Sequence, residues 1–562
     1  MKRFNFISTF RSVLQSNLYS IVIPTILVLI NLVLKTRYVK HPSLAMDEPF
    51  SVYHSQFDIT TIITELSYGN NPPLFEIFLH FWTILFGISE FSVRFPSVMF
   101  SSLSVYFLYQ ICYKYVNLKT AILASVLFTL SNYQLYFAQE ARVYSLFMLL
   151  TIISFYLYVK LMTLKHSKIN ITTYIFINTL LLYSHFFSWF VLFVQAISLI
   201  IIYRKNMSDL LRFTKYFGVI FLLFSPYIKI FIERFLDSSN GTWVAPVKNL
   251  LPIHSFYSSL INDTRIGYVL ILILSWIILQ KYIIRYFTEK LTKGLLIILS
   301  TAFVLISLSL RLPLEPSYLL PIENEFSSTF EIIAFLLFYL AIFIHFLLNN
   351  DRSRHEKIIV SWFFIPAFIM FLSSFYIPMF IDRYLIYCTP PFFIVVAIIV
   401  GKLENKLFMS FSLFIIILMT VSFTPISNNK RDVKTLIAKV KKMKSNSRSA
   451  VFICPDYFIE TFTYYYNNSY FKDIKSQDPY EDMINNLQTE HIYHVKNYKT
   501  IDSICNLNKY DKIIYVDAAA DFAYRKNNIK AYFNSKIRKI SVSVDSTHVP
   551  SIFYIYSYKL QN

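Results

Sequence analysis

The chain has 562 residues, of which 55% are hydrophobic and only 15% are charged, and its formal net charge is +20. This composition is too apolar for one soluble core and is typical of a protein that crosses the membrane many times. Lys and Arg cluster at the ends of apolar runs, which indicates membrane topology rather than a nucleic-acid-binding surface.

Apolar runs of membrane-spanning length predict about 13 transmembrane helices. They lie at about 17–35, 94–114, 120–137, 143–162, 171–185, 186–203, 212–231, 265–285, 294–311, 328–348, 358–377, 384–400 and 406–424. The first run lacks a small-residue cleavage site and is interpreted as a retained signal anchor. With a cytoplasmic N-terminus, every basic turn falls inside, as the positive-inside rule requires. We therefore expect a multi-pass protein of the bacterial plasma membrane.

One apolar segment, residues 70–87 (NNPPLFEIFLHFWTILFG), is left out of this count. It is short, begins with Pro-Pro and carries Glu76 and His80. Counting it as a span would move every later basic turn to the outer side. It is therefore predicted to be a helix at the outer membrane surface.

The odd number of spans leaves the C-terminal part of the chain outside the cytoplasm. Its runs SAVFICPDY, DKIIYVDAA and SIFYIYSYKL read as strands, and RDVKTLIAKVKKM has helical spacing. The predicted domains are a transmembrane catalytic domain at 1–424, with a first outer loop at 41–93, and a soluble extracytoplasmic α/β domain at 425–562. A disulfide between Cys454 and Cys505 stays open.

Two adjacent carboxylates, Asp47 and Glu48, follow the first span. Acids beside hydrocarbon are costly to keep and often mark function. Sugar transfer to a hydroxyl needs a carboxylate that accepts the acceptor's proton, and a second one could hold a metal or orient the acceptor. The alternative is that both residues only solvate a loop.

Three further polar residues lie in other outer loops under this topology. Glu140 could complete a cation site or bind sugar hydroxyls, or it could be an acid at a helix start beside an interfacial Arg142. His185 could contact a phosphate or a metal, or pack among its aromatic neighbours.

Arg94 and Arg383 lie at the outer ends of two spans. Guanidinium groups there suit a lipid-linked phosphate, whose charge grows as the glycosyl bond breaks. Alternatively, they extend to lipid headgroups or pair with an acid such as Asp382. Trp243 could stack on a sugar or mark the interface, and Glu76 is expected to shape the acceptor side.

The motifs DEPFSVYHS, NNPPLFEIFLHFW, EFSVRFPSVMF, QEARVYSLFMLL, YSHFF and DRYLIYCTPP occur in an order that resembles the bacterial glycosyltransferase family 39 proteins. These are relatives of the protein O-mannosyltransferases and of the lipid A aminoarabinose transferases. The resemblance implies a GT-C fold, a polyprenyl-phosphate-linked sugar donor and inversion at the anomeric carbon. It also implies that Asp47 is the catalytic base, with Glu48 beside it, and that Arg94, Glu140 and Arg383 match family positions.

The expected function is therefore transfer of a sugar from a polyprenyl phosphate to a lipid, glycan or protein hydroxyl on the outer face of the membrane. Asp47 and Glu48 are the predicted catalytic residues, and Arg94, Arg383 and Arg142 are the predicted phosphate ligands. Glu140, His185, Glu76 and Trp243 are expected to bind substrate or support a metal. No cofactor is required by the sequence, a divalent metal stays open, and no nucleic-acid partner is expected. The rival functions are a transporter or flippase of lipid-linked sugars and a non-catalytic assembly protein.

Overall fold

We describe the protein from a computed structural model. The structure describes residues 17–262, 353–424 and 432–559, with internal gaps at 46, 164–166, 204–206, 240, 243, 245, 250, 445–447, 472–478, 505, 525 and 537–552, and also positions 267, 270 and 274. The spans predicted at 265–285, 294–311 and 328–348 lie almost wholly outside the described residues.

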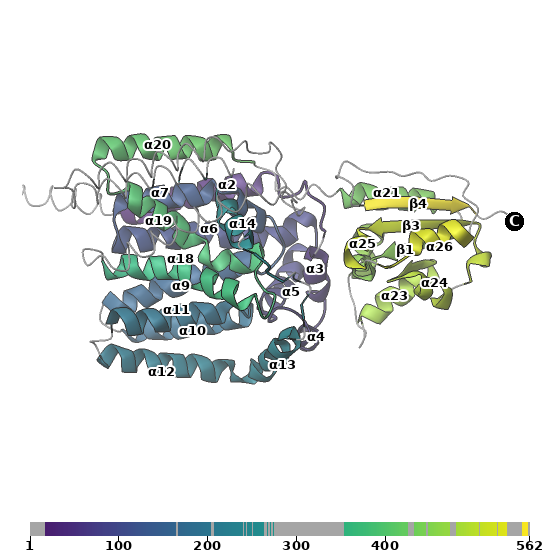
Figure 1. Ribbon diagram of the computed structural model, residues 1–562, viewed down its shortest axis with the longest axis horizontal. Helices are drawn as coiled ribbons and strands as arrows, with labels where there is room; N and C mark the ends of the chain where they lie inside the picture. Colours follow the sequence, from purple (N-terminus) through teal and green to yellow (C-terminus); the bar gives the residue numbers. More distant parts are fainter. Residues whose placement is uncertain are drawn as a thin grey trace, which may run out of the picture.

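A bundle of roughly parallel helices forms the first part of the chain (Figure 1). Its elements are η1 (Leu18–Val22), α2 (Ile23–Thr36), α6 (Glu90–Tyr115), α7 (Leu118–Thr129), α8 (Asn132–Ala138), α9 (Tyr144–Thr163), α10 (Lys168–Ser184), α11 (Ser188–Tyr203), α12 (Met207–Phe224), η2 (Ser225–Tyr227), α13 (Ile228–Ser239), α14 (Leu251–Ser259), α18 (Arg354–Ser373), η3 (Asp382–Cys388), α19 (Pro390–Val400) and α20 (Asn405–Val421). The predicted division between the runs 171–185 and 186–203 falls where α10 ends and α11 begins.

Polar caps define where several of these apolar helices begin. Ser89, Asn117, Ser131, Ser167 and Ser353 each accept a hydrogen bond from the backbone N–H three residues later. Such a side chain satisfies a donor that the first turn would otherwise leave unpaired. The caps thus fix the ends of the helices that carry the loops between them.

Not every predicted span is one straight helix. Among the described residues, four helices are long and apolar enough to cross a membrane, or six if each of two bent pairs forms one span. The bent pairs are α7 with α8, at 62°, and η3 with α19, at 51°. Ser131 caps α8 after the first bend, and α19 begins with two prolines, so both breaks have a local cause.

The two ends of the bundle differ in chemistry. One end, here called the basic end, gathers Lys114, Lys119 and Lys402: the Lys119 ammonium donates to Asn405 at 2.6 Å, and Lys402 lies 3.5 Å from Glu356. The opposite end, here called the site end, carries the short helices α3 (Glu48–His54), α4 (Ile59–Ser67) and α5 (Leu74–Phe86) (Figure 1). The segment predicted as a surface helix is α5, with 13 residues.

The C-terminal α/β region lies beyond the site end (Figure 1). It consists of α21 (Val433–Met443), β1 (Ser449–Cys454), η4 (Asp456–Phe458), α22 (Ile459–Tyr466), η5 (Asn468–Phe471), α23 (Pro479–Thr489), β2 (Ile492–His494), α24 (Tyr498–Ile504), η6 (Leu507–Lys509), β3 (Lys512–Ala518), α25 (Ala520–Ala523), α26 (Ile529–Lys536) and β4 (Phe553–Lys559). The described strands have the order β2-β1-β3-β4, with β1 parallel to β2 and β3, and β4 antiparallel to β3. Cys454 at the end of β1 is a buried free thiol.

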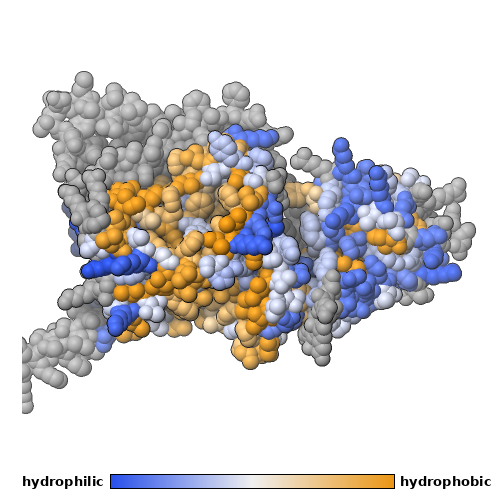
Figure 2. All heavy atoms as spheres, turned by 90° about the horizontal axis from the view of Figure 1, so that it is seen from below, coloured by the Kyte–Doolittle hydropathy of each residue, from blue (hydrophilic) through white to orange (hydrophobic). Residues whose placement is uncertain are grey.

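Surface chemistry separates the two parts of the molecule. Figure 2 shows apolar residues over the helical bundle and mostly hydrophilic ones over the C-terminal α/β region. An apolar exterior is expected where lipid replaces water as the solvent. The fold is thus a polytopic helical membrane protein with a C-terminal α/β region.

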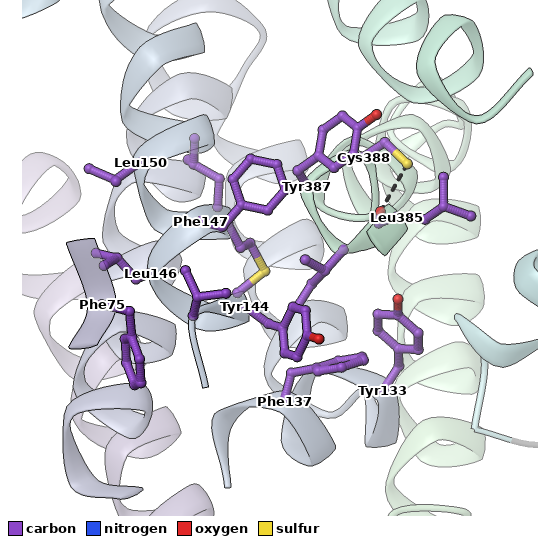
Figure 3. Packing of buried hydrophobic residues seen from close by; sticks show 14 of the residues in the cluster. Phe75, Tyr133, Phe137, Tyr144, Leu146, Phe147, Leu150, Leu385, Tyr387 and Cys388 are labelled. Atoms are coloured by element: carbon purple, nitrogen blue, oxygen red, sulfur yellow. Dashed lines mark hydrogen bonds between the residues drawn. The ribbon is translucent and has the colours of Figure 1, made fainter. Parts of the chain in front are cut away.

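Aromatic side chains from several helices pack beneath the site end. Phe137 lies 4.9 Å from Tyr133 and 5.3 Å from Tyr144, and Phe147 lies 5.0 Å from Tyr387, between ring centroids (Figure 3). These contacts join α8, α9 and η3 into one buried layer. The polar loops of the site end are therefore supported by closely packed aromatic side chains.

Candidate active site

Helix α3 begins at the acid pair. Asp47 occupies the N-cap position but its side chain makes no cap hydrogen bond, and Glu48 is the first helical residue, followed by Pro49. Proline is well suited to a first helical turn because the N–H that it lacks has no partner there. Consecutive residues on a helix point in different directions. The two carboxylates therefore enter different environments.

Glu48 is sealed inside the protein by Arg94 of α6. Arg94 Nε donates to Glu48 Oε1 at 2.7 Å, Nη2 donates to Oε2 at 2.6 Å, and the Ala141 N–H also donates to Oε1. The remaining Arg94 hydrogens bind the carbonyls of Val39, Pro42 and Ser43. Both residues are 1% exposed.

All five N–H donors of Arg94 are thus used within the protein. The structure therefore differs from the expected roles of two residues: Arg94 has no donor left for a phosphate, and Glu48 cannot reach an acceptor or a metal. The pair instead fixes the loop that carries Asp47 to the start of α6. A bidentate arginine–carboxylate contact suits this because it holds both distance and orientation.

Asp47 and Arg383 form the exposed ion pair of the site. Arg383 Nη1 donates to Asp47 Oδ2 at 2.5 Å, and the side chains of Arg383 and Asp47 are 27% and 43% exposed. Arg383 is carried by η3, far away in the sequence but at the same end of the bundle. Unlike Glu48 and Arg94, these two groups can meet a substrate.

Arg142 contacts the backbone of Asp47 and lies beside Glu76 of α5. Its Nη1 donates to Ser51 Oγ at 2.6 Å and to the Asp47 carbonyl at 3.3 Å. Ser51 Oγ in turn donates to Glu76 Oε1 at 2.6 Å, and Glu76 lies 3.8 Å from Arg142. The buried Nε of Arg142 has no hydrogen-bond partner among the described residues.

His185, in the turn between α10 and α11, offers a second unpaired donor. Its Nδ1 accepts a hydrogen bond from the Phe187 N–H, and its ring stacks on Phe147 at 4.7 Å. Burial, together with the positive charges of Arg142 and Arg383, lowers the pKa of His185 to about 3. The imidazole is therefore neutral with its hydrogen on Nε2, and within the described part of the chain Nε2 has no partner.

Glu140 approaches the same region from the loop before α9. Burial raises the pKa of Glu140 to about 7, and the negative charges of Glu48 and Asp47 act in the same direction. The structure thus brings together most residues predicted for the site: Asp47, Glu48, Glu76, Arg94, Glu140, Arg142, His185 and Arg383. Trp243 lies outside the described residues. In the described ranges, no three acidic, His or Cys side chains are grouped as a metal site would require.

One residue near the site was not expected from the sequence. Glu460 of α22, in the C-terminal region, is 9% exposed. Burial raises its pKa to about 8, and the charge of Asp47 acts in the same direction while Arg142 opposes it. The sequence around it, IETFTYYY, has no motif that would distinguish a functional glutamate from one in an ordinary helix.

Comparisons with known proteins bear on one segment of the chain and on the fold. Residues 70–230 match the family model of dolichyl-phosphate-mannose-protein mannosyltransferases. No curated protein sequence matches the chain. ArnT from Cupriavidus metallidurans, solved bound to undecaprenyl phosphate, superposes with a TM-score of 0.54 at 8% identity, over 95% of this chain and 97% of that one.

A further similar structure is the oligosaccharyltransferase AglB from Archaeoglobus fulgidus, with a TM-score of 0.48 at 12% identity, over 89% of this chain and 69% of that one. The family model covers the segment that carries Glu76 of α5, Arg94 of α6 and Arg142, and the ArnT likeness covers the fold of nearly the whole chain. The chain thus has the GT-C fold of ArnT, and its residues 70–230 resemble the dolichyl-phosphate-mannose-protein mannosyltransferases.

Proposed function

We propose that the protein moves a sugar from a polyprenyl-phosphate donor to an acceptor hydroxyl on the extracytoplasmic face of the membrane, with inversion. The observation that carries this proposal is the ion pair of Asp47 and Arg383, a carboxylate and a guanidinium that are both partly exposed at the site end. The likeness to ArnT, which was solved with undecaprenyl phosphate, supports this class of donor.

Three groups are proposed to bind the donor phosphate: Arg383, the Nε of Arg142 and the Nε2 of His185. The last two are buried donors without a described partner, and the charges of both arginines act on His185. Buried donors without a partner are costly, and a phosphate oxygen would satisfy them. Arg94, which the sequence suggested for this role, is not included.

In the proposed reaction, the Asp47 carboxylate accepts the proton of the acceptor hydroxyl. The hydroxyl oxygen forms a bond to the anomeric carbon while the bond from that carbon to the phosphate oxygen breaks. The electron pair leaves with the polyprenyl phosphate, whose charge becomes more negative by one. Cationic donors positioned at that oxygen stabilise the developing charge, and no acid is needed to protonate the leaving group.

The first prediction concerns the base. Asp47→Asn keeps the shape of the side chain but cannot accept a proton, so transfer should fall by roughly 10²- to 10⁴-fold, the usual contribution of a general base. The measurement is transfer of the label from radiolabelled undecaprenyl-phosphate sugars to an added hydroxyl acceptor, octyl β-D-glucopyranoside or a short threonine peptide, by the full chain in nanodiscs, together with release of undecaprenyl phosphate.

Asp58→Asn is the matched control. Asp58 lies in the same outer loop and caps α4 by accepting from the Thr60 and Thr61 N–H groups, which asparagine can also do. The control should transfer like the wild type. Full activity of Asp47→Asn would remove this residue from the reaction.

A further inference from the structure

The C-terminal α/β region is joined to the site end by hydrogen bonds of tyrosine hydroxyls. The Tyr464 hydroxyl donates to the Ile88 carbonyl at 2.7 Å, and the Tyr465 hydroxyl accepts from the Leu44 N–H and donates to Glu90. From the other side, the Tyr53 hydroxyl of α3 donates to the Pro479 carbonyl at 2.6 Å. One hydrophobic core continues from the bundle into β1 and α22. This region is thus packed on the loop that holds Asp47.

Helix α22 presents Glu460 toward that loop. Glu460 lies four residues before Tyr464, so both project from one face of α22, the face whose tyrosine contacts the bundle. The helix also contacts α3, which begins at the acid pair. The electrostatic influence of Asp47 and Arg142 on Glu460 is consistent with this position.

Glu460 is unusual because its side chain is nine-tenths buried and has no hydrogen-bond or ion-pair partner among the described residues. Its carboxyl group makes no hydrogen bond or ion pair with any residue that the structure describes, although its exposed fraction is only 9%. Carboxyl groups are rarely buried in this way unless something binds them. Nearby, Tyr480 is 37% exposed and close enough for the charge of Glu460 to act on its hydroxyl.

We propose that Glu460 is a binding residue for the acceptor, that the acceptor is a carbohydrate, and that the C-terminal region completes the active site. This inference rests on the proposed function. A sugar carries a second hydroxyl on the carbon next to the one that bears the attacking hydroxyl. One sugar can therefore hydrogen-bond to Asp47 and to Glu460 at the same time. The partly exposed ring of Tyr480 provides an apolar face for the sugar's C–H groups. A serine or threonine side chain offers one hydroxyl only.

The experiment compares the full-length wild type, Glu460→Gln and Glu460→Asp in nanodiscs. The donors are radiolabelled undecaprenyl-phosphate sugars, and the acceptors are octyl β-D-glucopyranoside and a short threonine peptide. The assays are run at pH 9, above the pKa of about 8 of Glu460, so that its carboxylate is charged. Loss of a hydrogen bond to this charged group should then raise the KM for the glucoside by roughly tenfold or more in Glu460→Gln. The affinity for undecaprenyl phosphate should not change. The matched control is Asp482→Asn, an exposed acid on α23 of the same region.

Each result decides the proposal. A raised KM for the glucoside with unchanged donor affinity supports it, and partial recovery in Glu460→Asp supports a role for the charge. An unchanged KM, or transfer by the wild type to the peptide but not to the glucoside, overturns it. If Glu460→Gln and Glu460→Asp both lose donor binding together with thermal stability, Glu460 is structural and the proposal fails. A wild type that releases no undecaprenyl phosphate contradicts the proposed function itself.

Discussion

Asp47 and Arg383 neutralise each other in the structure, which has a consequence for the order of binding. Their 2.5 Å contact uses the carboxylate that should accept a proton and the guanidinium that should hold the phosphate. A phosphate that binds Arg383 competes with Asp47 for it. Donor binding would therefore release the base, and the base would become available only when a donor is in place.

This competition predicts opposite effects on binding and on transfer. Asp47→Asn removes the competing charge, so its affinity for undecaprenyl phosphate should rise by about two- to fivefold, the value of a partly exposed ion pair. Arg383→Gln should weaken the same binding. Isothermal titration of undecaprenyl phosphate into nanodiscs measures both, with Asp58→Asn as the reference. Weaker binding by Asp47→Asn would show that the pair does not compete with the phosphate.

Glu140 gives a pH dependence of stability. Its pKa is raised from 4.5 to about 7 in the folded protein, so the folded state binds the proton more tightly than the unfolded state. The stability that protonation provides is complete below pH 4.5 and is lost as the pH rises through about 7. The difference in melting temperature between wild type and Glu140→Gln should change across this window and stay constant above it. A difference independent of pH would contradict the shift.

At this scale the charged residues could be predicted from the sequence, but not which of them pair with one another. Polar side chains between apolar runs are visible in the sequence, which is why Asp47, Arg142 and Arg383 were expected. The separate environments of Asp47 and Glu48 were not, because they depend on where the guanidinium of Arg94 lies. Glu460 was missed because nothing in a soluble helix indicates that it packs beside a distant loop.

At the scale of elements, hydrogen bonds join the two bent helix pairs at the site end. The Tyr133 hydroxyl of α8 donates to the Asp382 carbonyl of η3 at 2.5 Å, and Gln134 Nε2 donates to Thr389 Oγ1 at 2.7 Å. The runs at 120–137 and 384–400 were correctly expected to be helical, but their bends were not. Apolar periodicity continues through a bend, so it cannot show one.

The contact from α8 to η3 predicts an indirect effect on donor binding. Tyr133→Phe leaves the Asp382 carbonyl without its donor and loosens the 3₁₀ segment that carries Arg383. Loss of one such hydrogen bond should weaken the binding of undecaprenyl phosphate by about two- to tenfold. Tyr183→Phe, which removes a hydroxyl bound to the Leu223 carbonyl at 3.2 Å, is the control. Equal affinities in the two variants would show that η3 does not need this support.

At the scale of the whole molecule, the two ends of the bundle are distinguished by the charged residues that they carry. Helix α6 has 26 residues, about 39 Å, with Arg94 near its start and Lys114 near its end. Its first turns therefore belong to the site end and its last turn to the basic end. The basic turns indicated this arrangement in the sequence, because the positive-inside rule depends only on composition and order. The close packing of the C-terminal region onto α3 could not be expected, because it depends on single tyrosine contacts.

This arrangement predicts which positions share a side of the membrane. Glu65→Cys on α4 and Asp482→Cys on α23 replace exposed residues at the site end and in the C-terminal region, and Glu404→Cys replaces an exposed residue at the basic end. A membrane-impermeant maleimide should label the first two in intact cells and the third only after permeabilisation. The variants are made in a Cys505→Ser background, because Cys505 lies outside the described residues, and this background is the control, since Cys112, Cys388 and Cys454 are buried. Labelling of position 482 without position 65 would separate the C-terminal region from the proposed active site, because the tyrosine contacts between them require one common side.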